Sequence, residues 1–265
     1  MKQVLIKTNL YRPALNLYNS VRQLPQGGRN ILRRVKGAPD GQPLPPAKLI
    51  FTVAGTTNVE WFLHTGKLAF ETIRDVLEKN GIPLGSLGKV LDFGSGCGRV
   101  ARYWHGQTAQ LFGTDYNAEL IEWCEANLPA TSFAVNKLSP PLNYGNGTFD
   151  LVYALSVFTH LSEDLQFAWM DELRRIIRPG GLLFITLHGR YYLAHALDEA
   201  QRGEFEAGRP VVVHSNFSGS NACNIYHPES YVREKMTKGF TVVDCIPEGA
   251  LGNPRQDVYL LRKNG

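Results

Sequence analysis

Hydrophobic positions along the chain follow a helical period first and then alternate between short strands and helices. Residues 58–79 repeat apolar side chains at helical spacing, Asn58 can cap this run, and Asn80-Gly81-Ile82-Pro83 ends it. Such alternation is typical of a parallel, doubly wound α/β sheet, whose ligands bind beyond the carboxyl ends of the strands. After the first helix the pattern predicts strands at 88–93, 110–114, 131–135, 149–155 and 182–187, with helices at 97–107, 117–127 and 163–177.

Between residues 188 and 238 the chain departs from this alternation. Residues 210–214 and 222–226 predict a hairpin, and His227-Pro228-Glu229 opens a helix after it. We expect this insertion to cover a substrate site, although ordinary hairpin packing accounts for some of its aromatic residues. The candidates that combine an aromatic ring with a polar tip, or line the same surface, are Tyr191, Tyr192, His214, Phe217 and Tyr226.

Composition indicates a globular protein with a full core. The 265 residues are 43% hydrophobic, and no apolar run approaches the roughly 18 residues of a membrane span. The first residues lack a long apolar region and a small-residue cleavage site, so we expect a cytoplasmic protein. The four cysteines show no C-x-x-C spacing, which favours reduced thiols and no metal site.

Charge is concentrated in the first 48 residues, which hold nine Lys or Arg and one Asp. Because the whole chain has a formal charge of +4, the remainder is mildly acidic. The sequence therefore predicts a basic arm with a proline-rich linker at 1–48 and a folded domain at 49–265. The arm could bind nucleic acid, anionic lipid or an acidic carrier protein, or it could be a solvated tail with no partner.

A glycine-rich loop follows the first predicted strand. Val90-Leu91-Asp92-Phe93 leads into Gly94-Ser95-Gly96-Cys97-Gly98, where glycine permits a sharp turn and close approach to a ligand. Arg99 occupies the third glycine position of a dinucleotide fingerprint, so hydride-transfer chemistry is disfavoured. With its leading Asp92, the loop resembles the first motif of the class I S-adenosylmethionine-dependent methyltransferases.

The resemblance extends over residues 58–190. Residues 149–161 resemble the family's fourth strand and the turn after it, and Arg178-Pro179-Gly180-Gly181 opens the fifth strand as in many members. The resemblance implies a seven-stranded, mostly parallel Rossmann-like sheet. Residues 241–246 and 256–262 fit its last two strands, with the seventh strand antiparallel between the fifth and the sixth.

The same resemblance implies S-adenosylmethionine as the cofactor. Asp115 ends the second strand, where a carboxylate can bind both ribose hydroxyls, although it could instead cap the next helix if Asn117 does not. Asn136 follows the third strand, where relatives often carry an acid that binds the adenine amino group; its side-chain oxygen can accept that bond, or it could be an ordinary loop asparagine. The expected cofactor residues are Asp92, Gly94, Ser95, Gly96, Gly98, Asp115, Tyr116, Asn136, Leu155 and Ser156.

Two histidines are candidate bases. His188 ends the fifth strand and Asp257 begins the antiparallel seventh strand at the same edge, so we expect the carboxylate to orient the imidazole and to raise its basicity. His160, in the segment that borders the transferred methyl in relatives, is the competitor. Either residue could instead have a purely structural role, so the base is undecided at this stage, and in-line alignment could suffice for methyl transfer without a base.

The sequence thus predicts a methyltransferase that acts on a hydroxyl of a small-molecule or sugar-like acceptor. Methylation of oxygen is preferred over methylation of nitrogen or carbon, because the chain has neither the N-P-P-[YF] tetrad of amide methylation nor a cysteine-nucleophile site. A nucleic-acid methyltransferase that uses the arm around Arg29, Arg33, Arg34 and Lys36 is one alternative. A cofactor-binding but inactive scaffold is another.

Overall fold

The computed structural model describes residues 27–213, 223–252 and 255–265. The chain forms two compact units, of which the first ends at His64 and the second runs from Thr65 to Gly265. The first unit therefore extends beyond residue 48, and the functional boundary between an arm and a domain at that position stays a prediction.

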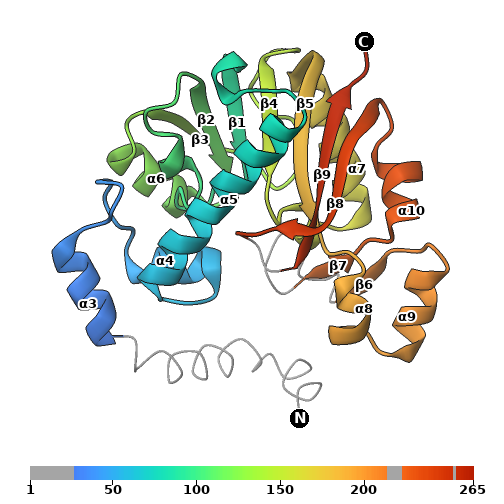
Figure 1. Cartoon of the computed structure of the whole chain (residues 1–265), viewed down its shortest axis with the longest axis horizontal. Coiled ribbons are helices and arrows are strands. Elements are labelled where there is room, and N and C mark those ends of the chain that lie inside the picture. The colour runs from blue at the N-terminus through green and yellow to red at the C-terminus, as the bar shows by residue number, and fades with distance from the viewer. Residues whose placement is uncertain (1–26, 214–222, 253–254) are drawn as a thin grey trace. The chain divides into compact units, whose positions relative to one another are not determined.

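The second unit is built on a seven-stranded sheet with the strand order β3-β2-β1-β4-β5-β9-β8 (Figure 1). The first five strands in this order are parallel, and β9 runs antiparallel between β5 and β8. This topology confirms the doubly wound, methyltransferase-like sheet expected from the sequence. The strand order reverses between β1 and β4, so their carboxyl ends border the crevice in which such sheets bind ligands. The strands are β1 (Lys89–Phe93), β2 (Gln110–Asp115), β3 (Thr131–Val135), β4 (Phe149–Ala154), β5 (Ile177–Leu187), β8 (Phe240–Ala250) and β9 (Gln256–Lys263).

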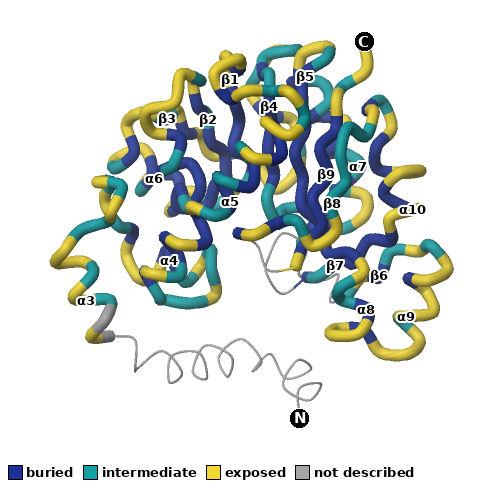
Figure 2. Tube along the Cα trace, viewed as in Figure 1, coloured by how far each residue is buried: buried dark blue, intermediate teal, exposed yellow. Residues whose placement is uncertain are grey.

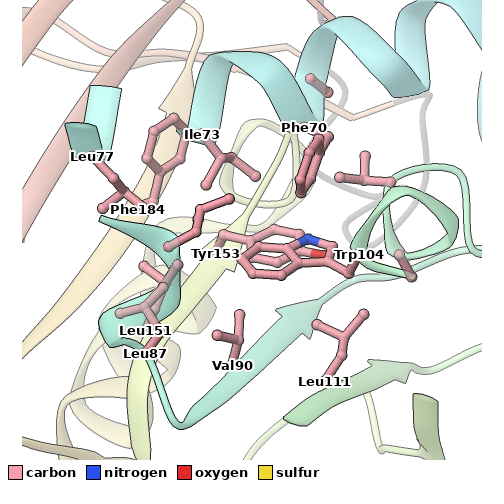
Figure 3. Packing of buried hydrophobic residues seen from close by; sticks show 14 of the residues in the cluster. Phe70, Ile73, Leu77, Leu87, Val90, Trp104, Leu111, Leu151, Tyr153 and Phe184 are labelled. Atoms are coloured by element: carbon pink, nitrogen blue, oxygen red, sulfur yellow. The ribbon is translucent and has the colours of Figure 1, made fainter. Parts of the chain in front are cut away.

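Helices cover both faces of the sheet, because successive strand residues point to opposite sides. Leu151 and Tyr153 of β4 pack on one face, whereas Val152 packs on the other. On the first face the Trp104 ring stacks on the Tyr153 ring, with 5.8 Å between the two ring centroids (Figure 3). Buried strands form the centre of the unit (Figure 2). The first face is covered by residues 65–79 of α5 (Val59–Lys79), η3 (Ala101–Trp104) and α6 (Ala118–Asn127), and the second by α7 (Glu163–Ile176), α10 (Glu229–Tyr231) and the π-helix η6 (Val232–Met236).

Two predicted elements differ from the structure. The helix expected at 97–107 is wrong: turns continue to residue 100 and only the short η3 follows. Gly98 has a φ of 72°, whereas an α-helix needs about −63°, so a helix cannot start at Cys97. The fifth strand starts at Ile177 rather than at residue 182, because Ile177 already pairs with Phe149 of β4.

The insertion forms the predicted hairpin, with β6 (Val211–Val213) antiparallel to β7 (Asn224–Tyr226). The hairpin is joined to the end of β5 by a bridge between His188 and Tyr226 and by the His227 N–H, which donates to the His188 carbonyl at 2.8 Å. A small core of its own includes Leu193, Leu197 and Phe205. The remaining elements of the second unit are η2 (Leu84–Ser86), η4 (Phe158–His160), α8 (Tyr191–His195) and α9 (Glu199–Glu206).

The first unit contains α3 (Gly27–Lys36), α4 (Ala47–Ala54) and the start of α5. Pro46 precedes α4, and Gly55 ends it in the left-handed conformation with a φ of 65°. Among the helices formed by the described residues, none combines the length and the apolar character that crossing a membrane requires.

Candidate active site

Three glycines in the left-handed conformation form the loop after β1. Gly94, Gly96 and Gly98 have φ values of 80°, 56° and 72°, which residues with side chains rarely adopt. A Cβ atom at Gly94 would also collide with the Val157 side chain. The N–H groups of Gly94 and Ser95 both donate to the Thr114 carbonyl, at 2.8 and 2.9 Å. The glycines thus allow the backbone to turn tightly beside the end of β2.

Asp115, at the end of β2, joins this loop to the crevice. Its Oδ2 accepts the Gly96 N–H at 3.0 Å and its Oδ1 accepts the Asn117 N–H at 2.9 Å. Burial raises the pKa of Asp115, and hydrogen bonds from backbone N–H groups oppose that rise. The cap of α6 is Asn117, whose side chain accepts the Glu119 N–H at 3.1 Å. Asp115 therefore keeps carboxylate lone pairs for hydroxyl groups of a ligand.

Buried polar atoms near the glycine loop lack hydrogen-bond partners within the described part of the chain. They are Ser95 Oγ, Thr114 Oγ1 and Asn136 Oδ1. An unsatisfied buried polar atom costs about 1 to 3 kcal/mol, so a ligand that supplies partners is favoured here. The Asn136 amide donates from Nδ2 to the Lys137 carbonyl at 2.6 Å, which leaves Oδ1 as the acceptor expected for an adenine amino group. These atoms fit the adenosine part of the predicted cofactor.

The other predicted cofactor residues lie in different environments. Asp92 is 4% exposed, and burial raises its pKa to about 7 against the opposing effects of a Tyr153 hydrogen bond and the Arg99 charge. Tyr116 is 51% exposed beside Asp115, and Leu155 packs partly buried against the core at the end of β4. Contact between these three residues and the cofactor stays a prediction.

Ser156 belongs to a polar network that links β4, β5 and β9. It has a φ of 61°, a strained conformation for a residue other than glycine. Its N–H donates to Thr186 Oγ1 at 2.8 Å, Thr186 Oγ1 donates to Gln256 Oε1 at 2.6 Å, and Gln256 Nε2 donates to Ser156 Oγ at 2.8 Å. Sequence reasoning missed Thr186 and Gln256. Their only signal is a polar residue at the end of one apolar strand and at the start of another.

His160 follows β4 in η4 and has a fixed tautomer. Its Nδ1 lies 2.6 Å from the Cys223 carbonyl, which can only accept, so Nδ1 carries the proton and Nε2 has a lone pair. Burial lowers the pKa of His160, and the Cys223 hydrogen bond partly offsets this effect. The neutral imidazole is therefore suited to accept a proton at Nε2.

The expected pairing of His188 with Asp257 is wrong. Asp257 is the register partner of Leu187, so the two side chains share one face of the sheet and His188 points to the other. A Cβ atom at Gly189, on the same face as Leu187, would collide with the Asp257 carboxylate, whose Oδ1 accepts the Glu248 N–H at 2.8 Å. His188 Nδ1 is buried and lacks a hydrogen-bond partner among the described residues. Burial, together with the nearby His160, lowers the pKa of His188 to about 3.

Aromatic rings surround His188. Its ring centroid lies 4.4 Å from Tyr192, 5.3 Å from Tyr226 and 6.2 Å from His160. Beside them His227, 1% exposed, places Nε2 at 3.0 Å from Gln166 Oε1. The Gln166 amide nitrogen donates to the Phe158 and Leu161 carbonyls, so its oxygen accepts the His227 proton. Burial then lowers the pKa of His227 to about 3.

The structure brings together Tyr192 and Tyr226 of the predicted substrate residues. Tyr191 lies at the edge of this group, with its ring centroid 5.3 Å from Tyr192 and with Arg255 over its ring at 5.3 Å. His214 and Phe217 lie outside the described residues. The histidine–tyrosine cluster, defined as His160, His188, Tyr192, Tyr226 and His227, therefore joins the end of the sheet to the insertion.

The sequence also matches known proteins. A family model described as a methyltransferase domain matches residues 91–185. The chain is 28% identical over 105 residues to a malonyl-[acyl-carrier protein] O-methyltransferase of Enterobacter lignolyticus, covering 40% of this chain and 41% of that protein. It is 30% identical over 122 residues to a ubiquinone biosynthesis O-methyltransferase of Rhizobium johnstonii, covering 45% of this chain and 48% of that protein. These matches span about half the length of the curated relatives or less.

The fold also matches solved structures. An S-adenosylmethionine-dependent methyltransferase from Clostridium acetobutylicum superposes with a TM-score of 0.53 at 13% identity, covering 75% of this chain and 92% of that one. At this level of identity, the likeness establishes a shared fold.

Proposed function

Because the chain belongs to the class I S-adenosylmethionine-dependent methyltransferase family, we propose that it is an active O-methyltransferase with a small-molecule acceptor. The cofactor is S-adenosylmethionine, which supplies the methyl group as an electrophilic substituent of its sulfonium when bound. The observation that carries the proposal is the neutral His160 of the histidine–tyrosine cluster, which follows β4 and carries its proton on Nδ1, so that Nε2 keeps a lone pair.

His160 acts as the general base in this proposal. As the acceptor oxygen takes the methyl group, the carbon–sulfur bond would break to leave a neutral thioether, and the hydroxyl proton would pass to His160 Nε2 while the imidazolium keeps its Nδ1–H on the Cys223 carbonyl. The lowered pKa means that His160 is neutral, and thus ready to accept the proton, at neutral pH. The backbone carbonyl of Cys223 therefore takes the orienting role that the sequence suggested for a carboxylate beside His188.

His188 is better suited to accept a hydrogen bond than to hold a proton. With a pKa of about 3 it is a weak base, but its unpartnered Nδ1 can receive a hydroxyl of the acceptor. We place it, with Tyr192 and Tyr226, in acceptor binding. Tyr191 contributes at the edge of the same surface in this proposal.

The charge state of the cluster favours an uncharged acceptor. Burial lowers the pKa values of its three histidines and raises that of Tyr192 to about 12, so these side chains are all neutral at pH 7, as is Tyr226. A phosphodiester would gain no ion pair from them, whereas a neutral ring with a hydroxyl can stack and hydrogen-bond. This lining supports a small molecule over a nucleic acid. The two curated relatives described above are named as O-methyltransferases, which supports an oxygen acceptor.

A methyl-transfer assay over a panel of phenols and alcohols tests the proposal. We expect His160→Gln to lower kcat by roughly 10²- to 10⁴-fold with unchanged cofactor affinity, because the loss falls on the proton-transfer step. His188→Gln should mainly raise the acceptor KM. His105→Gln is the matched control, since His105 is exposed. Full activity of the His160→Gln variant would refute the role of His160 as the base. Cofactor binding without turnover of any compound in the panel would refute the proposal that the protein is an active O-methyltransferase.

A further inference from the structure

The polar side of helix α3 contacts other residues of the first unit. Asn30 donates from Nδ2 to the Thr57 carbonyl at 2.8 Å and accepts the Val59 N–H at 3.1 Å. Arg33 pairs with Glu60, and Arg34 donates to the Pro45 carbonyl at 2.6 Å. Positions 30, 33 and 34 lie on one side of a helix. Hydrogen bonds and an ion pair therefore attach α3 through its polar side.

The opposite side of α3 is apolar and faces solvent. Ile31, Leu32 and Val35 are 66%, 56% and 81% exposed. An amphipathic helix of a globular protein normally buries its apolar stripe, so this orientation is inverted. Lys36, also exposed, flanks the stripe next to Leu32. We call Ile31, Leu32 and Val35 the α3 apolar stripe.

We propose that the α3 apolar stripe docks on an anionic lipid surface. Helices that lie in a membrane interface insert apolar side chains between headgroups while flanking Lys and Arg residues bind anionic lipids. The charge pattern is complementary to such a surface, because residues 1–48 hold nine Lys or Arg and one Asp. Of the three basic residues in the last turn of the helix, Arg33 and Arg34 lie on the attached side and Lys36 flanks the stripe, and the first turn holds no acid.

The size of the stripe favours lipid over a protein partner. A stable protein interface buries about 800 Å² on each side, which is more than three aliphatic side chains can supply. A lipid surface requires no matching shape, and a weak insertion adds to the electrostatic attraction. Because the polar side of α3 is bonded within the first unit, the α3 apolar stripe is already exposed, and docking on a lipid surface requires no rearrangement of the helix. The proposal is independent of the methyl-transfer chemistry.

Vesicle flotation of the full chain tests the proposal. We expect the protein to float with phosphatidylcholine vesicles that contain roughly one third phosphatidylglycerol, at about 0.1 M salt, and to bind pure phosphatidylcholine at least about tenfold more weakly. Leu32→Asp with Val35→Asp should weaken binding by about tenfold or more, because both residues leave the interface. Lys36→Ala should weaken it about fivefold, the effect of one charge.

The controls separate lipid docking from other causes. Leu251→Asp is the matched control, since Leu251 is 62% exposed in the second unit, and it should bind vesicles as the wild type does. Val35→Ser is a milder change that keeps the test valid if the double variant melts below the wild type. Absence of flotation, equal binding to neutral vesicles or unchanged binding by both stripe variants would overturn the proposal. A dimer that the stripe variants dissociate, without flotation, would assign the stripe to a second copy instead.

Discussion

Replacing Asp115 by alanine tests the cofactor site most directly. The carboxylate accepts the N–H groups of Gly96 and Asn117, and its remaining lone pairs are the ones assigned to the ribose hydroxyls. Removing it leaves those hydroxyls without partners in a site where the wild-type side chain is 9% exposed. The expected loss is about 1 to 3 kcal/mol, or roughly 5- to 150-fold in Kd for S-adenosylmethionine and its demethylated product.

Calorimetric titration of both ligands measures this loss. The Kd of the Asp115→Asn variant should lie between the values of the wild type and of Asp115→Ala, because the asparagine side chain retains one acceptor oxygen. The matched control is Asp150→Ala: Asp150 also accepts two backbone N–H groups, from Gly88 at 2.9 Å and Lys89 at 2.8 Å, but at the other end of the sheet. It should destabilise the fold without changing the Kd. An unchanged Kd in a folded Asp115→Ala protein would refute the ribose role.

Two further predictions follow from the buried polar groups. His188 and His227 stay neutral in the folded protein, where their pKa values are about 3, but they take up protons near pH 6.5 when the protein is unfolded. Acidification from pH 7 to about 5 should therefore lower the free energy of unfolding by up to about 2 kcal/mol for each histidine. Denaturant titrations will measure this slope, and a double His188→Phe, His227→Gln variant that keeps it would contradict the assignment. Gln256→Leu should destabilise the fold by about 1 to 3 kcal/mol and weaken cofactor binding, because Ser156 and Thr186 each lose a partner. Thr241→Val removes an exposed hydrogen bond to Asn264 as its control, and equal effects of the two changes on cofactor Kd would refute the link.

The sheet could be predicted because its signal is local. The strands β1, β2, β4 and β5 carry buried or half-buried apolar residues on both faces, and short apolar runs of this kind identify buried strands without knowledge of their neighbours, whereas β3 at the sheet edge buries Phe133 alone. The helix expected after the glycine loop failed for the opposite reason. Apolar spacing from 97 to 107 suits a helix, but Gly98 adopts φ 72° and Gly106 adopts φ 82°, and periodicity does not report these angles.

The proximity of the glycine loop to Asp115 could be predicted for the same local reason. The glycine loop and Asp115 each adjoin the end of a strand, and neighbouring parallel strands end at the same edge. The network of Ser156, Thr186 and Gln256 was not accessible: Ser156 lies in the 149–161 motif, but Gln256 is 100 residues away and carries no motif. Only the antiparallel pairing of β9 with β5 brings them together.

The proposed choice of His160 over His188 as the base depends on the register of two strands. Sequence reasoning placed His188 and Asp257 at the same edge of the sheet, and the structure does so too, but Leu187 is the residue opposite Asp257. Because side chains alternate between faces, this offset sends the carboxylate to the face of Gly189 and leaves the imidazole among tyrosines. Without a nearby carboxylate, burial dominates and the pKa of His188 falls to about 3, whereas His160 is oriented by a backbone carbonyl that no side-chain pattern reveals. A shift of β9 by one residue would place the Asp257 carboxylate on the face of His188, so the proposal of His160 as the base depends on the register of β5 with β9.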